Sequence, residues 1–249
     1  MVALLDLTGK VVIVTGSSSG IGEATARLLH AAGALPVLAA RRADRLAGLS
    51  AELGGALAVP TDVTDPEQQR ALVQAALERH GRVDGLVINA GASFHHRLED
   101  IDPAAYLQLL KLNVVSVVAG MQAVLPVMRR QRAGRIVSVS SGTTRMAPPG
   151  AGGYAASKAA MNMLTEVARK EFAADGVDVS LVLPSITASE FAGGRFLPGA
   201  AGARPGMVVH TAEYVGRVIL RALRTGEERI DIPHGPELPE LTEPAPETR

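Results

Sequence analysis

The chain has 249 residues, 47% of them hydrophobic, and its 25 basic residues balance its 25 acidic ones. This balance argues against a nucleic-acid or anionic-membrane partner, and the absence of cysteine excludes disulfides, thiol catalysis and cysteine-ligated zinc. The N-terminus has no signal-like core and no apolar run is long enough to span a bilayer, so we expect a cytoplasmic protein without a membrane partner.

Short β-branched runs alternate with longer amphipathic stretches along the chain. Nearly all-apolar strands are typical of a sheet covered on both faces, and the alternation predicts βαβ units. Right-handed crossovers then give an α/β fold with a doubly wound parallel sheet of the Rossmann type, three αβα layers and about seven strands. The sequence predicts strands over 10–15, 35–40, 56–60, 83–89, 135–140, 177–183 and 229–232, and helices over 20–32, 42–53, 66–80, 103–130, 154–174 and 212–225.

We expect one domain over residues 1–232. Asp65-Pro66 and Asp102-Pro103 each combine an N-cap residue with proline at the first helical position, which predicts two helix starts. Residues 189–207, rich in glycine, alanine and proline, are expected to form a mobile segment over the site. The proline- and glutamate-rich tail, 233–249, is expected to be extended or disordered.

A glycine-rich turn follows the first strand and opens a helix. Its glycines allow a tight turn and let backbone N–H groups approach a pyrophosphate at the helix N-terminus. The spacing is Gly-x-x-x-Gly-x-Gly, unlike the common dinucleotide fingerprint, and an ordinary strand–helix turn is the alternative. The expected contacts in this turn are Gly16, Ser18, Ser19, Gly20, Ile21 and Gly22.

Two arginines, Arg41 and Arg42, follow the second strand, where an NAD-binding half usually carries an acidic residue for the ribose 2′-hydroxyl. Guanidinium groups suit a 2′-phosphate because they are planar cations with several donors. The sequence therefore predicts NADP in preference to NAD, and the alternative is that both arginines merely open a solvated helix.

Tyr154 and Lys158 lie four residues apart in a predicted helix, so they share one helix face. A phenol beside an ammonium can shuttle a proton, which suggests redox chemistry on a carbonyl or an alcohol.

With these residues in place, the chain resembles the short-chain dehydrogenases/reductases of the single-domain type, from Gly9 to about Ile232. The motifs that carry the resemblance are the turn over 15–22, Asp62-Val63, Asn89-Ala90-Gly91, Asn113, Ser141, Tyr154-x-x-x-Lys158 and Pro184-Ser185.

The resemblance implies the catalytic roles. Tyr154 would be the general acid/base, and the Lys158 ammonium would lower the phenol pKa and bind the nicotinamide ribose. Ser141, thirteen residues before the tyrosine, would hold the substrate oxygen in preference to the neighbouring Ser138 or Ser140. Asn113 would position a water that links Lys158 to solvent. No metal is implied.

The resemblance also implies cofactor contacts. Asp62 and Val63 would flank the adenine, small residues at Asn89-Ala90-Gly91 would let the backbone approach, and Thr187, after Pro184, would lie near the carboxamide. The chain departs from the family pattern at Ile88, where an asparagine is usual, at Ser185, where glycine is usual, and at Ser189, where threonine is usual. Serine at position 185 would be strained if the backbone there had a positive φ.

Other polar residues are expected at the rim of the site. His95-His96 could line the substrate pocket, whereas adjacent histidines do not favour a metal site. Arg97 and Arg145 would suggest an anionic substrate if both faced inward, although solvated arginines are commoner. The helices over 104–130 and 154–172 correspond to the family's dimer interface, so a homo-oligomer, dimer or tetramer, is expected.

The leading interpretation is an NADP-dependent ketoreductase or alcohol dehydrogenase that acts on a small carbonyl or alcohol substrate. One alternative keeps the fold but is an epimerase or dehydratase with bound cofactor. The other is a non-catalytic, NADP-sensing protein.

Overall fold

The computed structural model describes residues 4–194 and 208–233, and its centre is a seven-stranded sheet. All strand pairs in this sheet are parallel, in the order β3-β2-β1-β4-β5-β6-β9. The predicted doubly wound fold is therefore confirmed. The strands are β1 (Val11–Thr15), β2 (Leu35–Ala40), β3 (Ala58–Pro60), β4 (Gly85–Ile88), β5 (Gly134–Val139), β6 (Val177–Leu183) and β9 (Arg229–Asp231).

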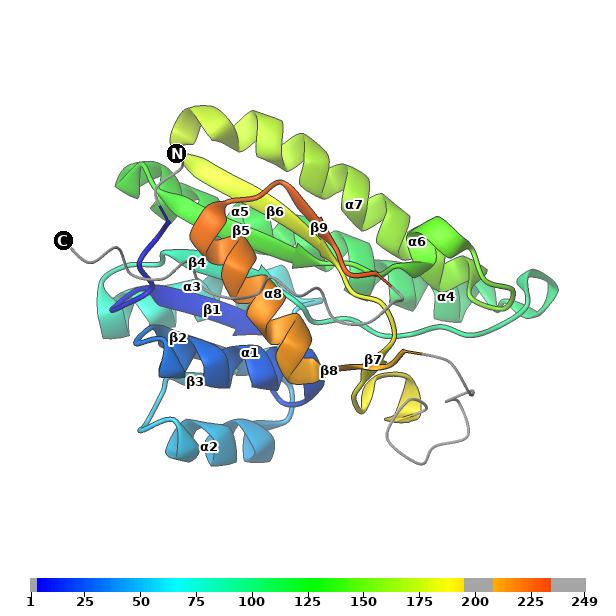
Figure 1. Cartoon of the computed structure of the whole chain (residues 1–249), viewed down its shortest axis with the longest axis horizontal. Helices are drawn as coiled ribbons and strands as arrows, with labels where there is room; N and C mark the ends of the chain where they lie inside the picture. Colours follow the sequence, from blue (N-terminus) through cyan, green and yellow to red (C-terminus); the bar gives the residue numbers. More distant parts are fainter. Residues whose placement is uncertain (1–3, 195–207, 234–249) are drawn as a thin grey trace.

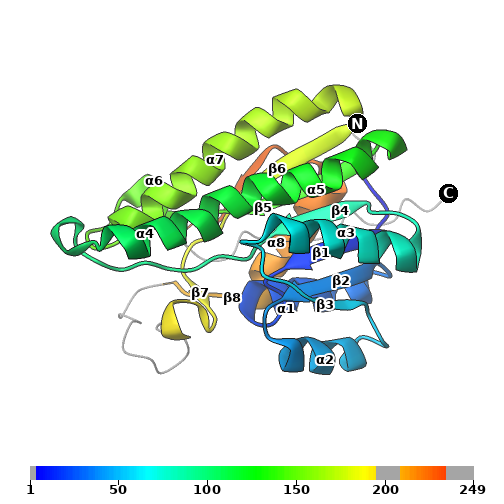
Figure 2. The same ribbon diagram turned by 180° about the vertical axis from the view of Figure 1, so that it is seen from behind.

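Helices cover both faces of the sheet. Figure 1 shows α1 and α8 over one face, and Figure 2 shows α3, α5 and α7 over the other. The helices are α1 (Gly20–Ala31), α2 (Ala43–Glu52), α3 (Pro66–His80), α4 (Pro103–Leu110), α5 (Ser116–Gln131), α6 (Thr143–Met146), α7 (Gly152–Phe172) and α8 (Ala212–Thr225). Shorter helical turns are η1 (Leu98–Asp100), η2 (Lys111–Val115), η3 (Ala173–Asp175) and η4 (Phe191–Gly194).

Successive side chains of β1 point to opposite faces of the sheet and pack in two separate hydrophobic clusters. Val11 and Ile13 pack in the cluster under α3, α5 and α7, whereas Val12 and Val14 pack in the cluster under α1 and α8. All four side chains are buried. This is why the strands read as continuous apolar runs without polar alternation.

The two predicted Asp-Pro helix starts are confirmed at α3 and α4. The Asp65 carboxylate accepts a hydrogen bond from the Glu67 backbone N–H at 2.9 Å. The Asp102 carboxylate accepts bonds from the N–H groups of Ala104 and Ala105. These caps fix where the sheet-covering helices begin and therefore how the loops before them approach the site.

The predicted helix over 103–130 is interrupted by the π-helical turn η2, which separates α4 from α5. A π turn holds one extra residue per turn, and such turns are frequent at functional sites. The sequence pattern also missed α6 and a small parallel pair, β7 (Thr187–Ala188) with β8 (His210–Thr211). Both are too short for a periodic pattern.

The sequence predicts no membrane span, and the stretch Pro103–Gln131 resembles one by length and composition alone, with mean hydropathy 1.6 over 18 residues. In the fold, 39% of that window is buried, and α5 packs against α3, β4 and β5. The apolar side chains of this stretch therefore pack within the helical layer that covers the sheet. The expectations for residues 195–207 and for the tail beyond Pro233 lie outside the described residues.

Candidate active site

The glycine-rich turn lies at the carboxyl ends of β1 and β4. Gly16 has φ of +68°, and a Cβ added to Gly22 would lie 2.3 Å from the Gly16 carbonyl oxygen. The Asn89 amide donates to the Thr15 carbonyl at 3.0 Å and so holds the turn against the end of β4. Glycine is therefore required at both positions for the backbone to double back tightly.

The start of α1 is suited to an anion. Its N-cap, Ser19, is extended, and no side chain among the described residues caps the first turn. Uncapped N–H groups at a helix N-terminus attract phosphate through hydrogen bonds and the helix dipole. Gly20 has φ of +56°, and Ile21 packs partly buried against the core. Because the N–H groups at the start of α1 are uncapped in the described part of the chain, the turn fits the expected pyrophosphate.

The Arg42 guanidinium lies over this same turn. Its Nε donates to the Ser18 hydroxyl at 3.1 Å and its Nη2 to the Ser19 hydroxyl at 2.7 Å. Its Nη1 forms an ion pair with Glu190 at 3.0 Å. Arg41 lies close enough to Asp62 to help lower that carboxyl's pKa, although hydrogen bonds from Thr64 are the larger cause. Two cations therefore border the place where an adenosine ribose would lie.

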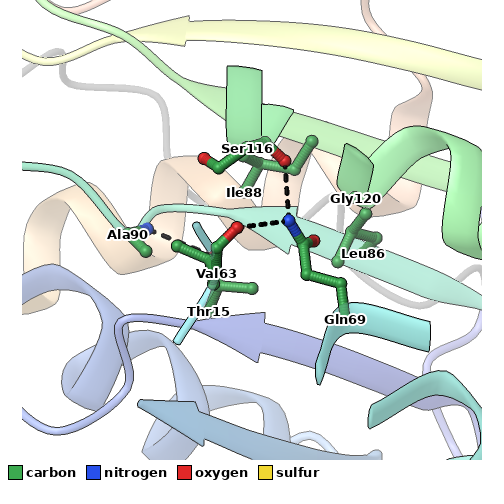
Figure 3. Close-up of a pocket in the computed structure, with 8 residues that line it drawn as sticks. All are labelled: Thr15, Val63, Gln69, Leu86, Ile88, Ala90, Ser116 and Gly120. Carbon is green, nitrogen blue, oxygen red and sulfur yellow. Dashed lines mark hydrogen bonds between the residues drawn. The ribbon is translucent and has the colours of Figure 1, made fainter. Parts of the chain in front are cut away.

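A small cavity lies at the ends of β1 and β4, next to the loop that follows β3, and its lining residues are shown in Figure 3. The Ala90 N–H donates to the Thr15 hydroxyl at 3.1 Å. The buried Gln69 amide donates to the carbonyls of Val63 at 2.7 Å and Ser116 at 2.9 Å, and so joins the loop after β3 to α5. The lining residues of the cavity, whose volume is about 10 Å³, are Thr15, Val63, Gln69, Leu86, Ile88, Ala90, Ser116 and Gly120.

Gln69 is a positioning residue that the sequence reasoning missed. It occupies a buried position of α3 that the helical pattern would reserve for an apolar side chain, and this mismatch was the available signal. Ile88, found where the family usually has asparagine, contributes an apolar wall to the same cavity. The Gln69 amide supplies a polar link there that Ile88 cannot make.

The Ser141 hydroxyl lies close enough to the Tyr154 phenol to lower the pKa of that phenol. The Ser141 hydroxyl also accepts bonds from the backbone N–H and the hydroxyl of Thr143, at 3.2 and 3.0 Å. The other two serines face elsewhere, because Ser138 is fully buried without a partner and Ser140 bonds to Asn162. Of the three serines, Ser141 is the one whose hydroxyl acts on the pKa of the phenol.

Lys158 lies one turn of α7 beyond Tyr154 and is only 3% exposed. Its ammonium donates to the Val139 carbonyl at 2.9 Å and lies 3.6 Å from the sulfur of Met161. A Cβ added to Gly91 would lie 3.6 Å from the same ammonium, so the loop after β4 passes close to it. The structure thus gathers the ends of β4 and β5 around this cation.

Burial shifts the pKa values of both Tyr154 and Lys158, and the expected acidification of the phenol by Lys158 stays a prediction. Burial raises the pKa of Tyr154 to about 12, and the nearby Ser141 hydroxyl offsets this only in part. Burial likewise lowers the pKa of Lys158 to about 8. Both shifts have one cause, since each charged form loses water in a low-dielectric site, and the ammonium is directed to Val139 rather than to the phenol.

Asn113 lies in the π-helical turn η2 and is buried. Its amide clamps the backbone of Ala92, accepting from the N–H and donating to the carbonyl, both at 3.0 Å. It also donates to the Ser157 hydroxyl at 3.1 Å, which in turn donates to the Tyr154 carbonyl. Asn113 therefore joins the loop after β4 to α7 through its side chain, and its relay of water remains a prediction.

The loop after β6 closes the opposite side of the site. The Pro184 carbonyl accepts a hydrogen bond from the Gly142 N–H at 2.8 Å, next to Ser141. Among the described residues, only Arg132 and Ala147 are non-glycine residues with positive φ, so serine at position 185 carries no such strain. Thr187 lies in β7, which is paired with β8.

The rim residues have surface partners. Arg97 pairs with Glu99 at 2.7 Å and Arg145 with Asp231 at 3.2 Å, and both arginines are exposed. The His96 ring packs against Phe94, with centroids 4.6 Å apart. These contacts do not support inward-facing arginines for an anionic substrate.

Phe191 is a rim residue that the sequence reasoning missed. Its ring lies 5.9 Å from the ring of Tyr154, centroid to centroid, and it is 41% exposed. A single phenylalanine in a glycine-rich segment carried no periodic signal.

Comparisons with known proteins agree with this geometry. Residues 10–196 match the family model described as short chain dehydrogenase. An uncharacterized oxidoreductase of Listeria innocua is 40% identical over 179 residues, which are 70% of this chain and 72% of the relative. One of Staphylococcus saprophyticus is 37% identical over 72% of this chain and 74% of its own length. A short-chain type dehydrogenase/reductase from Mycobacterium ulcerans superposes with a TM-score of 0.83 at 27% identity, covering 92% of this chain and 90% of its own.

Proposed function

This chain belongs to the short-chain dehydrogenase family and is an oxidoreductase, and from that premise we propose that it reduces a carbonyl or oxidises a secondary alcohol with NADP(H). The observation that carries the proposal is the Ser141 hydroxyl beside the Tyr154 phenol, one helical turn from the buried Lys158. This group lies at the same edge of the sheet as the glycine turn.

The residues divide the proton chemistry between them. When bound, NADPH supplies the hydride from its nicotinamide ring. The Tyr154 phenol is neutral near pH 7, because its ordinary pKa is about 10 and burial raises it further, so it can donate a proton to the substrate oxygen. The Ser141 hydroxyl, which lies beside the phenol, holds the same oxygen and stabilises charge that develops there. A neutral phenol is the form that carbonyl reduction requires, and the phenolate is the form that alcohol oxidation requires.

Lys158 prepares the site for loss of that proton. Its ammonium is buried beside Gly91 and Asn113, where it can bind a ribose hydroxyl and stabilise the phenolate that Tyr154 becomes. Asn113 holds the loop at Ala92 in place. We propose that it also positions a water molecule that links Lys158 to solvent.

The preference for NADP rests on Arg41 and Arg42. Arg42 already bonds the hydroxyls of Ser18 and Ser19, so a 2′-phosphate would meet a guanidinium and two hydroxyl donors together. Steady-state kinetics should give a higher kcat/KM with NADPH than with NADH, and Arg42→Ala should reduce the NADPH value selectively. Equal or higher kcat/KM with NADH would overturn this part of the proposal.

The activity is tested by following NADPH absorbance across a panel of ketones and aldehydes. Turnover that Tyr154→Phe abolishes, with NADPH binding retained in a fluorescence titration, supports the proposal. NADPH binding without turnover on any substrate would favour the non-catalytic alternative, and substrate conversion without net NADPH consumption would favour an epimerase or dehydratase.

We also propose that the protein acts as a cytoplasmic homo-oligomer, a dimer or tetramer. Large apolar side chains are exposed on α4, η2 and α7, and these elements pack side by side. A monomer mass by sedimentation at micromolar concentration would count against it. The exposed side chains are Leu107, Val115, Met163 and Val167.

A further inference from the structure

Glu190 lies in the segment after β7 and forms ion pairs with Arg42, which follows β2, and with Arg45 in α2. Its carboxylate lies 3.0 Å from Nη1 of Arg42 and 3.6 Å from Nη2 of Arg45. The residue before it, Ser189, is packed on the glycine turn, since a Cβ added to Gly20 would lie 2.9 Å from the Ser189 Cβ. The carboxylate is therefore delivered to Arg42 by a segment that already rests on the cofactor turn.

Arg42 has four bonded N–H positions, and Glu190 is the one anion among the partners that they reach. The other partners are the hydroxyl and carbonyl of Ser18 and the hydroxyl of Ser19. Hydroxyl groups can donate to phosphate oxygens, whereas a carboxylate can only repel them. A 2′-phosphate on Arg42 must therefore displace Glu190 or lie beside a like charge.

The displacement is feasible because the ion pair is exposed. The Glu190 side chain is 46% exposed and that of Arg42 is 42% exposed, so water and salt screen their attraction. Hydrogen bonding from Arg42 lowers the pKa of Glu190, so the carboxylate is ionised near neutral pH.

We infer that Glu190 is a specificity-determining residue that competes with the 2′-phosphate of the cofactor for Arg42. The competition makes the wild-type chain bind NADP(H) more weakly than its arginines alone would allow, while NAD(H), which has no 2′-phosphate, is affected little. This inference rests on the proposed NADP preference and adds to it an internal competitor.

The test compares two adenosine ligands that differ only at the 2′ position, adenosine 2′,5′-bisphosphate and adenosine 5′-monophosphate, by calorimetric titration of the full chain. Glu190→Gln should bind the bisphosphate roughly two- to fivefold tighter than wild type, the range of an exposed ion pair, and the monophosphate equally. Glu190 and Glu213 both line an open groove beside Ser19 and Gly20, and Glu213 is paired with Arg217 at 2.9 Å. The control is therefore Glu213→Gln, which removes the same charge from that groove without touching Arg42. It should change neither affinity.

The outcomes separate this inference from the proposed function. If wild type prefers the bisphosphate and Arg42→Ala removes that preference, but Glu190→Gln gains nothing, the inference about Glu190 is overturned. It is also overturned if Glu190→Gln tightens both ligands equally, or if Glu213→Gln matches it. If no variant distinguishes the two ligands and Arg42→Ala has no effect, the NADP preference itself fails. A thermal melt by circular dichroism confirms that each variant is folded.

Discussion

Replacing Lys158 with methionine should stabilise the cofactor-free protein while it removes activity. Burial lowers the pKa of Lys158 from 10.5 to about 8, which corresponds to about 3 kcal/mol of unfavourable free energy when the ammonium is charged. Methionine is an unbranched side chain one heavy atom shorter than lysine, and it loses the bond to the Val139 carbonyl, worth about 1–2 kcal/mol. The expected net gain in the free energy of unfolding is about 1–2 kcal/mol near pH 7.

The pH dependence gives this prediction a definite sign. The folded pKa of Lys158 lies below its unfolded value, so the unfolded chain binds more protons between about pH 8 and pH 10.5. Wild type therefore gains stability as the pH rises through this window and loses it as the pH falls toward 8. The advantage of the methionine variant should shrink by about 2 kcal/mol between about pH 7.5 and about pH 9.5.

Urea unfolding of both proteins without cofactor, at these two pH values, measures the difference. Lys170→Met is the matched control, because Lys170 is exposed on the same helix and its replacement should change stability little at either pH. Two results would refute the idea that burial of the Lys158 ammonium destabilises the folded protein. One is a Lys158→Met variant that is less stable than wild type at both pH values, and the other is a stability difference that does not vary with pH.

Three further substitutions test other parts of the structure. Tyr154→Phe should lower kcat by about 10²- to 10⁴-fold with NADPH affinity unchanged in a fluorescence titration, because it removes only the proton donor. Gly22→Ala should weaken NADPH binding and lower the free energy of unfolding by about 1–3 kcal/mol, since its Cβ would meet the Gly16 carbonyl. Asp65→Ala should cost about 1 kcal/mol in urea unfolding by uncapping α3.

Each of these has an opposing result. Retained turnover in the phenylalanine variant would assign proton transfer to another group. Gly48→Ala, at an open helical position, should leave binding intact, and equal behaviour of the two glycine variants would contradict the close approach at Gly22. Unchanged unfolding of the Asp65 variant would show that the cap contributes nothing.

The arrangement of strands and the residues of the site were predictable because they depend on local patterns. The apolar runs gave the seven strands of the sheet, and a spacing of four placed Tyr154 and Lys158 on one face of α7. The two Asp-Pro pairs likewise marked helix starts, since a cap acts within three residues.

What escaped prediction depends on tertiary packing. The π turn around Asn113 lies within an apolar helical pattern that shows no break, and its extra residue is accommodated by contacts with α7 and the loop at Ala92. The rise in the Tyr154 pKa follows from burial, which spacing alone does not reveal. The pairing of Arg42 with Glu190 joins residues 148 positions apart, beyond the range of any sequence period.

The position of β1 inside the sheet, between β2 and β4, affects how this protein is made. One of its neighbours, β2, is complete at Ala40, whereas pairing with the other, β4, begins at Gly85. At about 5–20 residues per second, roughly four to fourteen seconds of translation separate the synthesis of Thr15 from that of Gly85. During that interval a nascent chain carries an apolar strand edge without its second neighbour, so ribosome-bound fragments that end before Gly85 should require a chaperone to stay in solution.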